Sequence, residues 1–377
     1  MTDMLTIALA VLLAGSVGYC LLVMLGVLSW RRQKTTTAAR AAISVLKPLA
    51  GAEPGLADNL RSLFEQEYPE FEILFAVRSA DDSALPVVEA LRAEYPSVPS
   101  SVIVTGEPPY PSAKVFSLEL MLARAVHDLI VMSDSDVGLD RHDLATIAAE
   151  FGDARVGLVT CPYRAVAGPA LWSRLEQAFS NTEFFGGVMA ARLLEGMTFA
   201  LGPTLAVRRS VFAEVDGIRT MREYHADDFV IGRAVSDAGY KVVLSRAVVE
   251  HHLGSETFSR NAAHRLRWAR STRRSRPAGY FGQVFTYPLP LALLLCAVNP
   301  AWLPVLGPVL AVRAAAAWAV CRHALAAPVP WLTIPLQDIV SFIFWIAGFF
   351  GNTIRWRGRL YRIDAHGRIA LADGVKE

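Results

Sequence analysis

Residues 6–30 form an unbroken apolar stretch, TIALAVLLAGSVGYCLLVMLGVLSW, that contains no charged side chain. A helix of this length is long enough to cross a bilayer core of about 30 Å. A cleaved signal peptide is the alternative, but no basic segment precedes the stretch and it is longer than a typical signal-peptide core. The sequence therefore predicts a retained transmembrane helix within an N-terminal anchor, residues 1–34.

The basic residues after this stretch predict its orientation. The sequence RRQK at 31–34 puts positive charge on the C-terminal side, which the positive-inside rule places in the cytoplasm. Of the 377 residues, 53% are hydrophobic and 19% are charged, too apolar for an ordinary soluble protein and too charged for a pure membrane bundle. We therefore expect a cytoplasmic domain, residues 35–283, between apolar ends.

Apolar sequence returns in the C-terminal part of the chain. It runs from Val284 to Val320 with a break at NPAWLP, residues 299–304, and a further span covers 335–352. These features predict transmembrane or re-entrant segments in 284–354 and a basic tail, 355–377. If all three late segments cross, the tail lies outside, against the positive-inside rule, so the number of crossings stays open. The predicted location is a membrane, multi-pass, and in a bacterium the inner membrane.

Between residues 40 and 280, β-branched apolar runs alternate with helical patterns. The predicted strands are 42–49, 71–78, 100–106 and 128–137, and the predicted helices between them are 55–66, 84–95 and 113–127. This alternation predicts right-handed βαβ units and a mostly parallel sheet, hence an α/β fold. Ligands of such sheets bind beyond the carboxyl ends of the strands.

Acidic residues follow two of the predicted strands. Asp81 and Asp82 follow one, and Asp134 and Asp136 end the other. In an extended segment, residues i and i+2 project to the same side, so Asp134 and Asp136 can converge on one hard cation. Two carboxylates are the usual protein share of a Mg²⁺ or Mn²⁺ site that substrate phosphates complete. A solvated turn is the alternative, but the position after a buried strand favours a cation site.

A third acid pair, Asp227 and Asp228, opens a run of helical character. One interpretation is helix capping, because carboxylates at a helix N-terminus are stabilised by the dipole. The other is a general base that removes a proton from an attacking hydroxyl. The residues alone do not separate the two. The histidine pair His251 and His252 has no spacing typical of a zinc site.

Four motifs occur in one order along the chain: DD at 81–82, DSD at 134–136, ADD at 226–228 and HRLRW at 264–268. This series, ahead of C-terminal apolar spans, resembles the D, DxD, (E/D)D, (Q/R)xxRW series of family 2 and family 21 glycosyltransferases. Further segments are similar to the ceramide glucosyltransferase branch, and most of all to its bacterial members, which include hopanoid-associated N-acetylglucosaminyltransferases. These segments are SVLKPLAG, AKVFSL, VGLVTCPYR, LWSRLEQAFSNTEFF and WRGRLYR.

The resemblance implies a GT-A-type, Rossmann-like domain and a role for each matching residue. Asp82 would contact the nucleotide, Asp134 and Asp136 would bind the diphosphate through Mg²⁺ or Mn²⁺, and Asp228 would deprotonate the acceptor for an inverting displacement. The donor-binding set would be Asp82, Lys114, Asp134, His264 and Arg267. The acceptor would contact Gly202, Thr204 and Trp268.

The chemistry of the last motif agrees with these roles. In a helix, His264, Arg267 and Trp268 lie within one turn on one face. The guanidinium of Arg267 matches phosphate oxygens bidentately and stays charged. We expect the outer arginines, at 270, 273, 274 and 276, on the cytoplasmic leaflet. Residues 171–197 are expected to form an interfacial amphipathic helix, with a buried core helix as the alternative.

The implied activity is transfer of glucose or N-acetylglucosamine from a UDP-sugar to the hydroxyl of a lipid, either ceramide or a hopanoid. The expected partners are the UDP-sugar, the lipid acceptor and the bilayer, with no nucleic acid. Two departures from the family pattern, His264 in place of Gln or Arg and KVFS at 114–117, leave the donor sugar open. The alternatives are a processive polysaccharide synthase and a non-catalytic membrane protein with a basic binding patch.

Overall fold

The structure, a computed structural model, describes residues 2–33, 41–224, 226–255, 257–356, 359–364 and 367–371. The chain forms two compact units. We call residues 34–166 and 197–254 the sheet unit, and residues 1–33, 167–196 and 255–377 the helical unit. The chain therefore passes more than once between the units.

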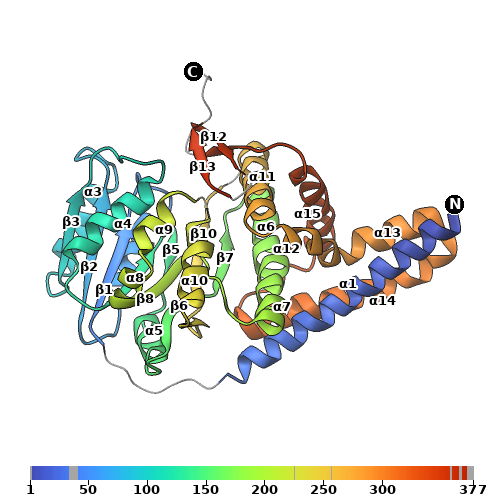
Figure 1. Ribbon diagram of the computed structural model, residues 1–377, viewed down its shortest axis with the longest axis horizontal. Helices are drawn as coiled ribbons and strands as arrows, with labels where there is room; N and C mark the ends of the chain where they lie inside the picture. Colours follow the sequence, from blue (N-terminus) through green and yellow to red (C-terminus); the bar gives the residue numbers. More distant parts are fainter. Residues whose placement is uncertain are drawn as a thin grey trace. The chain divides into compact units, whose positions relative to one another are not determined.

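The sheet unit is built on a seven-stranded sheet in the order β3-β2-β1-β4-β8-β6-β9 (Figure 1). The strands are β1 Ile43–Pro48, β2 Phe71–Val77, β3 Ser100–Val104, β4 Leu129–Ser133, β6 Val156–Thr160, β8 Thr204–Arg208 and β9 Lys241–Leu244. β1 runs parallel to β2 and β4, and β2 runs parallel to β3. The predicted mostly parallel sheet is confirmed, and the exception is β8, which is antiparallel to both β4 and β6.

Helices cover this sheet and close its core. They are α2 Leu56–Phe64, α3 Leu85–Glu94, α4 Ala113–Arg124, α5 Asp143–Glu150, α8 Arg209–Glu214, α9 Gly217–Arg222 and α10 Asp227–Asp237. Leu46 and Leu74 from the sheet pack in one buried cluster with Leu118 of α4 and Ile231 of α10. Strands covered on both faces need nearly continuous apolar runs, which is why ISVLKP, FEILFAV and LIVMS were recognisable in the sequence.

A second sheet of three short strands lies beside the end of β4. Its order is β5-β10-β7, with β5 Val137–Gly138, β7 Tyr163–Ala167 and β10 Val249–Leu253. β10 pairs antiparallel with β5 so that His251 stands opposite Val137. The chain between β4 and β5 is therefore held at both ends, and it contains Asp134 and Asp136.

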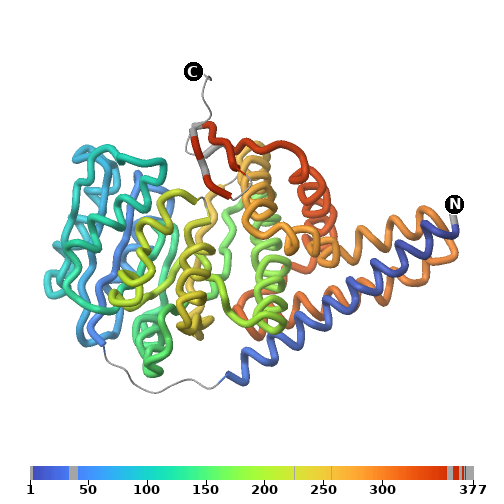
Figure 2. Tube along the Cα trace, in the orientation of Figure 1, coloured from blue at the N-terminus to red at the C-terminus, as the bar shows by residue number. Residues whose placement is uncertain are grey.

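The helical unit contains α1 Thr2–Arg31, which lies beside α13 and α14 for part of its length (Figures 1 and 2). The other helices are α6 Leu171–Ala178, the π-helix η1 Phe179–Phe184, α7 Phe185–Glu195, α11 Phe258–Ser275, α12 Pro277–Gly282, η2 Gln283–Thr286, α13 Pro288–Val298, η3 Pro300–Val305, α14 Leu306–Trp318, the π-helix η4 Ala319–Ala324 and α15 Ile334–Gly348. Gly26 of α1 permits close approach to α7, since a Cβ there would stand 2.5 Å from the Met189 carbonyl oxygen.

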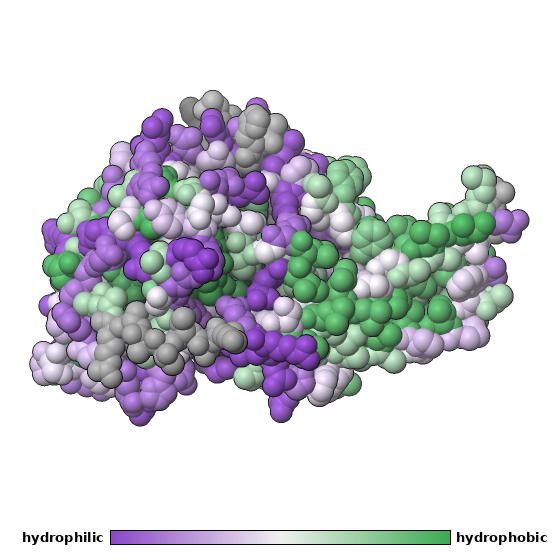
Figure 3. Space-filling model, turned by 60° about the horizontal axis from the view of Figure 1, so that its bottom comes forward, coloured by the Kyte–Doolittle hydropathy of each residue, from purple (hydrophilic) through white to green (hydrophobic). Residues whose placement is uncertain are grey.

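Among the described residues of this unit, two helices are long and apolar enough to cross a membrane, Asp3–Arg31 and Pro300–Ala324. The helices Pro277–Thr286 and Pro288–Val298 meet that test only as a pair, bent by 64°. Figure 3 shows a broad hydrophobic surface over α1, α13 and α14, where large side chains such as Ile7, Leu25 and Leu310 are exposed. The predicted break at NPAWLP is confirmed as the turn of η3 between α13 and α14.

The described part of the predicted basic tail forms strands. β11 Thr353–Trp356, β12 Arg359–Ile363 and β13 Ile369–Leu371 make an antiparallel sheet. Ile354, Tyr361 and Ile363 bury their side chains in it. In the sequence of this segment, basic residues alternate with these apolar ones. Such a period-2 pattern is typical of strands, but only the charge of the segment was used to predict a basic tail.

Candidate functional site

The acids predicted to bind a cation lie on the loop that follows β4, at the carboxyl end of the parallel strands. Asp134 Oδ1 lies 2.6 Å from the ammonium of Lys114, in the first turn of α4. Asp136 Oδ2 lies 3.1 Å from Nε2 of His251, on β10. Burial raises the pKa of Asp136, but the charges of His251 and Lys47 outweigh it and bring the pKa to about 2. For Asp134 the balance is the opposite: burial raises the pKa of its carboxyl, and the charge of Lys114 only partly offsets that shift.

His251 was not predicted as a site residue, because its spacing to other potential ligands in the sequence fits no metal pattern. The structure brings it to Asp136 through the antiparallel pairing of β10 with β5. The ring of Tyr163 packs edge-on against the imidazole at 5.4 Å between centroids. No local sequence signal reports a pairing between strands more than a hundred residues apart.

Lys47 is the second unpredicted residue beside the acidic loop. Its side chain is fully buried, and its ammonium donates to Ser133 Oγ at 3.2 Å and to the Val137 carbonyl at 2.9 Å. Burial lowers the pKa of Lys47 to about 8, and the nearby charges of Asp136 and Asp134 oppose that shift. The amide of Asn59 donates to the Ser135 carbonyl at 3.2 Å. The loop is therefore held from its interior side as well as at its ends.

Asp228 lies in the first turn of α10, as the sequence predicted for the third acid pair. Burial and the charge of Asp227 raise the pKa of Asp228 to about 7, whereas the Phe229 amide and the charge of Lys114 lower it. A Cβ at Gly202 would stand 3.1 Å from Asp228 Oδ2, so glycine permits the carboxylate to approach this backbone. Lys114 is electrostatically linked to Asp134, Asp227 and Asp228. The structure thus brings the second and third acid motifs together.

Asp82 and Thr204 have mainly backbone-organising contacts. The carboxylate of Asp82 accepts from the amides of Gly51 and Ala84, at 3.0 and 2.9 Å, and so links the loops after β1 and β2. Thr204 is fully buried, and its hydroxyl donates to Pro203 O at 2.8 Å and lies 3.3 Å from Ser133 Oγ. With no exposed surface, the Thr204 side chain offers no contact to an acceptor in this conformation.

The acidic loop fits a divalent cation by the chemistry of its donors. Asp134 and Asp136 retain 32% and 37% of their side-chain exposure, and each has a carboxylate oxygen outside its ion pair. Mg²⁺ and Mn²⁺ prefer such oxygens and commonly take one or two carboxylates plus substrate phosphates. Among the described residues, no three His, Cys, Asp or Glu side chains stand close enough to hold a metal by themselves. A cation here would take its remaining oxygen ligands from water or from a substrate.

The residues of the last motif lie on α11, in the helical unit. His264 and Trp268 pack edge to face with 5.2 Å between ring centroids, so these two of the three predicted residues share a helix face. Trp268 also packs against Phe184 of η1 at 5.4 Å, and His264 Nδ1 lies 3.4 Å from Glu176 Oε1. Burial raises the pKa of Glu176, but the charges of Arg265 and His264 dominate and lower it to about 2.

The outer arginines of α11 have partners that the sequence did not predict. Arg270 donates to the carbonyls of Phe350 and Thr353, and Arg273 donates to those of Phe349 and Gly351. These four carbonyls follow the end of α15, where the backbone has no further helical turn to supply donors. The two arginines supply those donors. Arg276 pairs with Glu195. These arginines therefore make contacts within the helical unit, in addition to any contact with the leaflet that the sequence led us to expect.

The segment predicted as an interfacial amphipathic helix is the continuous run of α6, η1 and α7. Its middle is packed within the helical unit, where Phe185 and Met189 are fully buried, in line with the core-helix alternative. Only its two ends expose large apolar side chains, Leu171 and Leu194. Trp172 stacks on Phe258 at the first of these ends.

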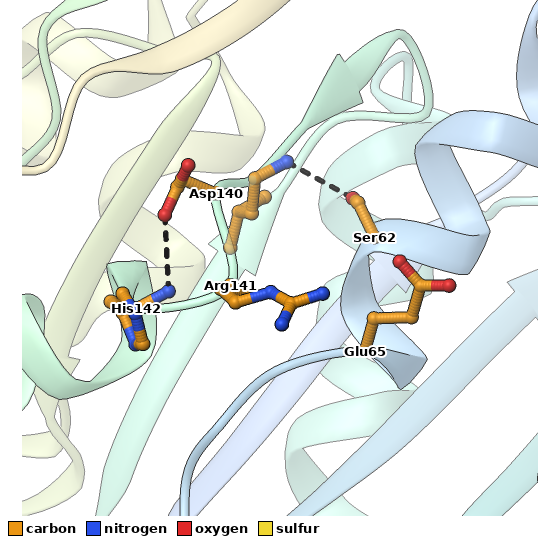
Figure 4. Close-up of a pocket in the computed structure, with 6 residues that line it drawn as sticks. Ser62, Glu65, Asp140, Arg141 and His142 are labelled. Carbon is orange, nitrogen blue, oxygen red and sulfur yellow. Dashed lines mark hydrogen bonds between the residues drawn. The ribbon is translucent and has the colours of Figure 1, made fainter.

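A shallow surface pocket of about 370 Å³ lies elsewhere on the sheet unit, between α2 and the loop after β5 (Figure 4). Ser62 and Glu65 line one side, and Asp140, Arg141 and His142 line the other. The Leu139 amide donates to Ser62 Oγ at 3.0 Å, and Asp140 accepts from the His142 amide at 3.3 Å. None of the predicted site residues lines it, so the acidic loop remains the candidate site.

The mixed sheet with acids beyond its parallel strands is the fold of GT-A glycosyltransferases. The mannosyltransferase PcManGT from Pyrobaculum calidifontis, solved with GDP-Man and Mn²⁺, superposes with a TM-score of 0.57 at 19% identity. That alignment covers 93% of this chain and 99% of the other. The fold class of the protein is therefore that of the GT-A glycosyltransferases.

Sequence comparison gives the family. Residues 8–369 match glycosyl transferase family 21, and the chain belongs to this family. Ceramide glucosyltransferase 3 of Caenorhabditis elegans is 25% identical over 229 residues, which are 60% of this chain and 50% of that protein. Ceramide glucosyltransferase of Komagataella phaffii is 32% identical over 99 residues, 25% of this chain and 19% of that protein. The chain spans about half or less of the length of these curated relatives.

Proposed function

We propose that this protein is a membrane-associated, inverting glycosyltransferase that moves glucose or N-acetylglucosamine from a UDP-sugar to the hydroxyl of a lipid. Ceramide and a hopanoid are the two acceptors that the family resemblance suggests. One observation carries the proposal: Lys114 links the Asp134 carboxylate to the Asp227 and Asp228 pair at the carboxyl ends of parallel strands. Such a site combines charges for a diphosphate with a base for an alcohol.

The proposed roles follow from the chemistry of each group. Asp228 accepts the proton of the acceptor hydroxyl, and its pKa near 7 suits a base that works at neutral pH. Lys114 stabilises the charge that develops on the leaving diphosphate. A divalent cation bound by Asp134 and Asp136 would neutralise diphosphate charge as a Lewis acid. Gly202, whose missing side chain lets the Asp228 carboxylate approach the backbone, lies where the family resemblance puts the acceptor.

The remaining assignments stay predictions from the family resemblance. Asp82 contacts the nucleotide, His264 and Arg267 contact the diphosphate, and Trp268 forms an apolar wall beside the acceptor. The sheet unit lies in the cytoplasm, and the helical unit associates with the bilayer through α1 and the segment Pro300–Ala324. The domain limits predicted at residues 34, 283 and 354 also remain proposals.

The test is a product assay. Purified protein with Mn²⁺ or Mg²⁺ receives UDP-glucose or UDP-N-acetylglucosamine together with ceramide, a hopanoid or a mixed lipid extract, and the products are identified by mass. We expect one added sugar per lipid. A product series with many sugar units would support a processive synthase instead, and the absence of any glycolipid with every donor and acceptor would refute the proposal.

Asp228→Asn is the informative variant, because it keeps the side-chain shape and removes the proton-accepting charge. We expect transfer to fall by about 10²–10⁴-fold, the usual contribution of a general base. UDP-sugar binding, measured by calorimetry, should stay close to wild type. The matched control is Asp237→Asn on the same helix, whose carboxylate pairs with Arg233 on the exposed surface. Normal transfer by Asp228→Asn would show that another group is the base.

A further inference from the structure

Lys47 is the feature of the sheet unit that the proposed mechanism leaves unexplained. Its side chain is fully buried on β1, although lysines are almost never fully buried without partners. Taking an ammonium out of water costs several kcal/mol unless hydrogen bonds and opposite charges compensate. An apolar side chain at this position of the sheet would avoid that cost. The partners of Lys47 should therefore indicate why a lysine, and not an apolar residue, occupies this position.

The two hydrogen-bond partners of Lys47 bracket the acidic loop. Nζ donates to Ser133 Oγ, on the residue before Asp134, and to the carbonyl of Val137, on the residue after Asp136. The ends of a five-residue segment are thus joined through a single ammonium. In the same segment the Val137 amide donates back to the Asp134 carbonyl at 3.3 Å, which makes the loop a tight turn.

Other contacts also hold the acidic loop, but none of those described links Ser133 to Val137 as Lys47 does. The Asp134 amide donates to Pro203 O at 3.0 Å, and the His252 amide donates to Asp136 O at 2.8 Å. Each of these bonds joins one point of the loop to another strand. Among the contacts described for this loop, Lys47 is the side chain that bonds to both ends, so it sets the distance between them.

We propose that Lys47 is a positioning residue that fixes the spacing and direction of the Asp134 and Asp136 carboxylates for one divalent cation. The inference rests on the proposed function, in which those carboxylates bind the cation. Lys47 touches neither the cation nor the sugar donor. It acts through the backbone that carries the two ligands, as groups behind metal ligands commonly do.

The sign of the effect separates this role from simple electrostatics. The ammonium carries positive charge and so repels a cation at the loop. If Lys47 acted only through its charge, its neutralisation would strengthen cation binding. If it acts by holding the loop, neutralisation weakens cation binding in spite of the lost repulsion. A structural role remote from the loop would change stability and leave cation binding alone.

The experiment measures Mn²⁺ binding directly, by the loss of the free-ion electron paramagnetic resonance signal, with the full-length protein and UDP present. Lys47→Met keeps the length of the side chain and removes both charge and donors. We expect Mn²⁺ to bind about 10–100-fold more weakly to Lys47→Met than to wild type. The matched control is Ser44→Ala on the same strand. The Ser44 hydroxyl is equally buried and donates to Glu72 at 2.6 Å, away from the acidic loop.

Each outcome decides a point. Unchanged or tighter Mn²⁺ binding by Lys47→Met overturns the inference, and so does an equal weakening in Ser44→Ala. No Mn²⁺ binding by the wild type refutes the proposed cation itself, which distinguishes that failure from a failure of Lys47. If Lys47→Met does not fold, Ser133→Ala removes one of the two bonds and retains the ammonium. Weaker Mn²⁺ binding by that variant supports the inference, and unchanged binding overturns it.

Discussion

Asp228 combines burial with a like-charged neighbour, and both act on its pKa in the same direction. Burial disfavours the ionised carboxylate, and the negative charge of Asp227 disfavours it further, so that the pKa rises to about 7. A base works only in its ionised form. The proton-accepting form of this residue is therefore lost as the pH falls through neutrality.

This pKa predicts an acid limb in the pH profile of the transferase. We expect kcat/KM to be constant above about pH 8 and to fall to about one tenth of that value at pH 6, because kcat/KM reports ionisation in the unliganded enzyme. Steady-state rates with saturating cation, between pH 5.5 and 9, provide the measurement. A profile that stays flat through pH 6 would contradict a base with this pKa.

Asp227→Asn is the control for that profile. Removing the adjacent charge lowers the pKa of Asp228, so the acid limb should move to lower pH while the plateau changes less than in Asp228→Asn. Asp237→Asn, at the far end of the same helix, should leave the limb in place. A limb unmoved in Asp227→Asn would mean that another group titrates.

At the residue scale, the sequence marked Asp134 and Asp136 as candidates because they follow an apolar strand. Asp228 was marked because it stands beside another acid at the start of a helical run. Lys47 and His251 carried no such signal. From the sequence alone, the lysine within ISVLKP would be expected to face solvent. Only the hydrogen bond to Ser133 of the neighbouring β4 shows that its ammonium faces the acidic loop. His251 becomes a neighbour of Asp136 through strand pairing alone.

The helices α14, α15 and η1 are joined by a buried ion pair. The Arg313 guanidinium donates from Nε and Nη2 to the Asp338 carboxylate at 2.8–3.2 Å, and also to Thr182 Oγ1 at 3.0 Å. Both charged side chains are almost fully buried. Charged groups among apolar helices are costly unless they are paired, so each partner depends on the other.

We therefore expect single substitutions of this pair to be far worse than the double one. Arg313→Met or Asp338→Leu alone leaves an unpaired buried charge, which costs about 3–5 kcal/mol. Arg313→Met together with Asp338→Leu should recover much of the stability. Thermal denaturation in detergent, followed by fluorescence-detected size-exclusion chromatography, measures this. The exposed pair Arg233 and Asp237 serves as control, and its disruption should change the melting temperature little.

At the element scale, periodicity located the first four predicted strands and the three helices between them to within a few residues, whereas the strands of the C-terminal tail were missed. These patterns could not predict the π-helical turns η1 and η4, because a π-helix is a local change in hydrogen bonding within an otherwise helical run. In the structure the two π-helices contact each other, because Cys321 of η4 donates to the Asn181 carbonyl of η1.

The arrangement within the helical unit bears on the number of membrane crossings. Near the start of α1, Leu9 and Leu13 pack with Val309 of α14. At the other end of α1, Arg31 Nη1 lies 3.3 Å from His323 Nδ1, at the end of the segment Pro300–Ala324. The two apolar helices therefore run parallel along their shared length. The end of η4 returns to the side on which α1 ends.

We predict that the C-terminal tail lies on the cytoplasmic side. α15 has 15 residues and so spans about 22 Å, which is short of a bilayer core of about 30 Å. It therefore does not cross, and Arg362 stays on the same side as Arg31, in accord with the positive-inside rule. A fusion of alkaline phosphatase to the C-terminus should be inactive in a bacterial host, and a green fluorescent protein fusion should fluoresce.

The control for this topology is the same phosphatase fused at residue 305, at the turn between α13 and α14, where it should be active. An active phosphatase at the C-terminus would mean that α15 crosses after all.

The sequence by itself determined the first βαβ units, the apolar helices, the family and the acids of the candidate site, because periodicity, buried runs and motif order are local properties. The tertiary structure decided which distant residues meet. It placed Lys47 and His251 beside the acidic loop, gave Arg270 and Arg273 the carbonyls beyond α15, and paired Arg313 with Asp338. Such contacts arise from strand order and helix packing, which depend on the whole chain at once.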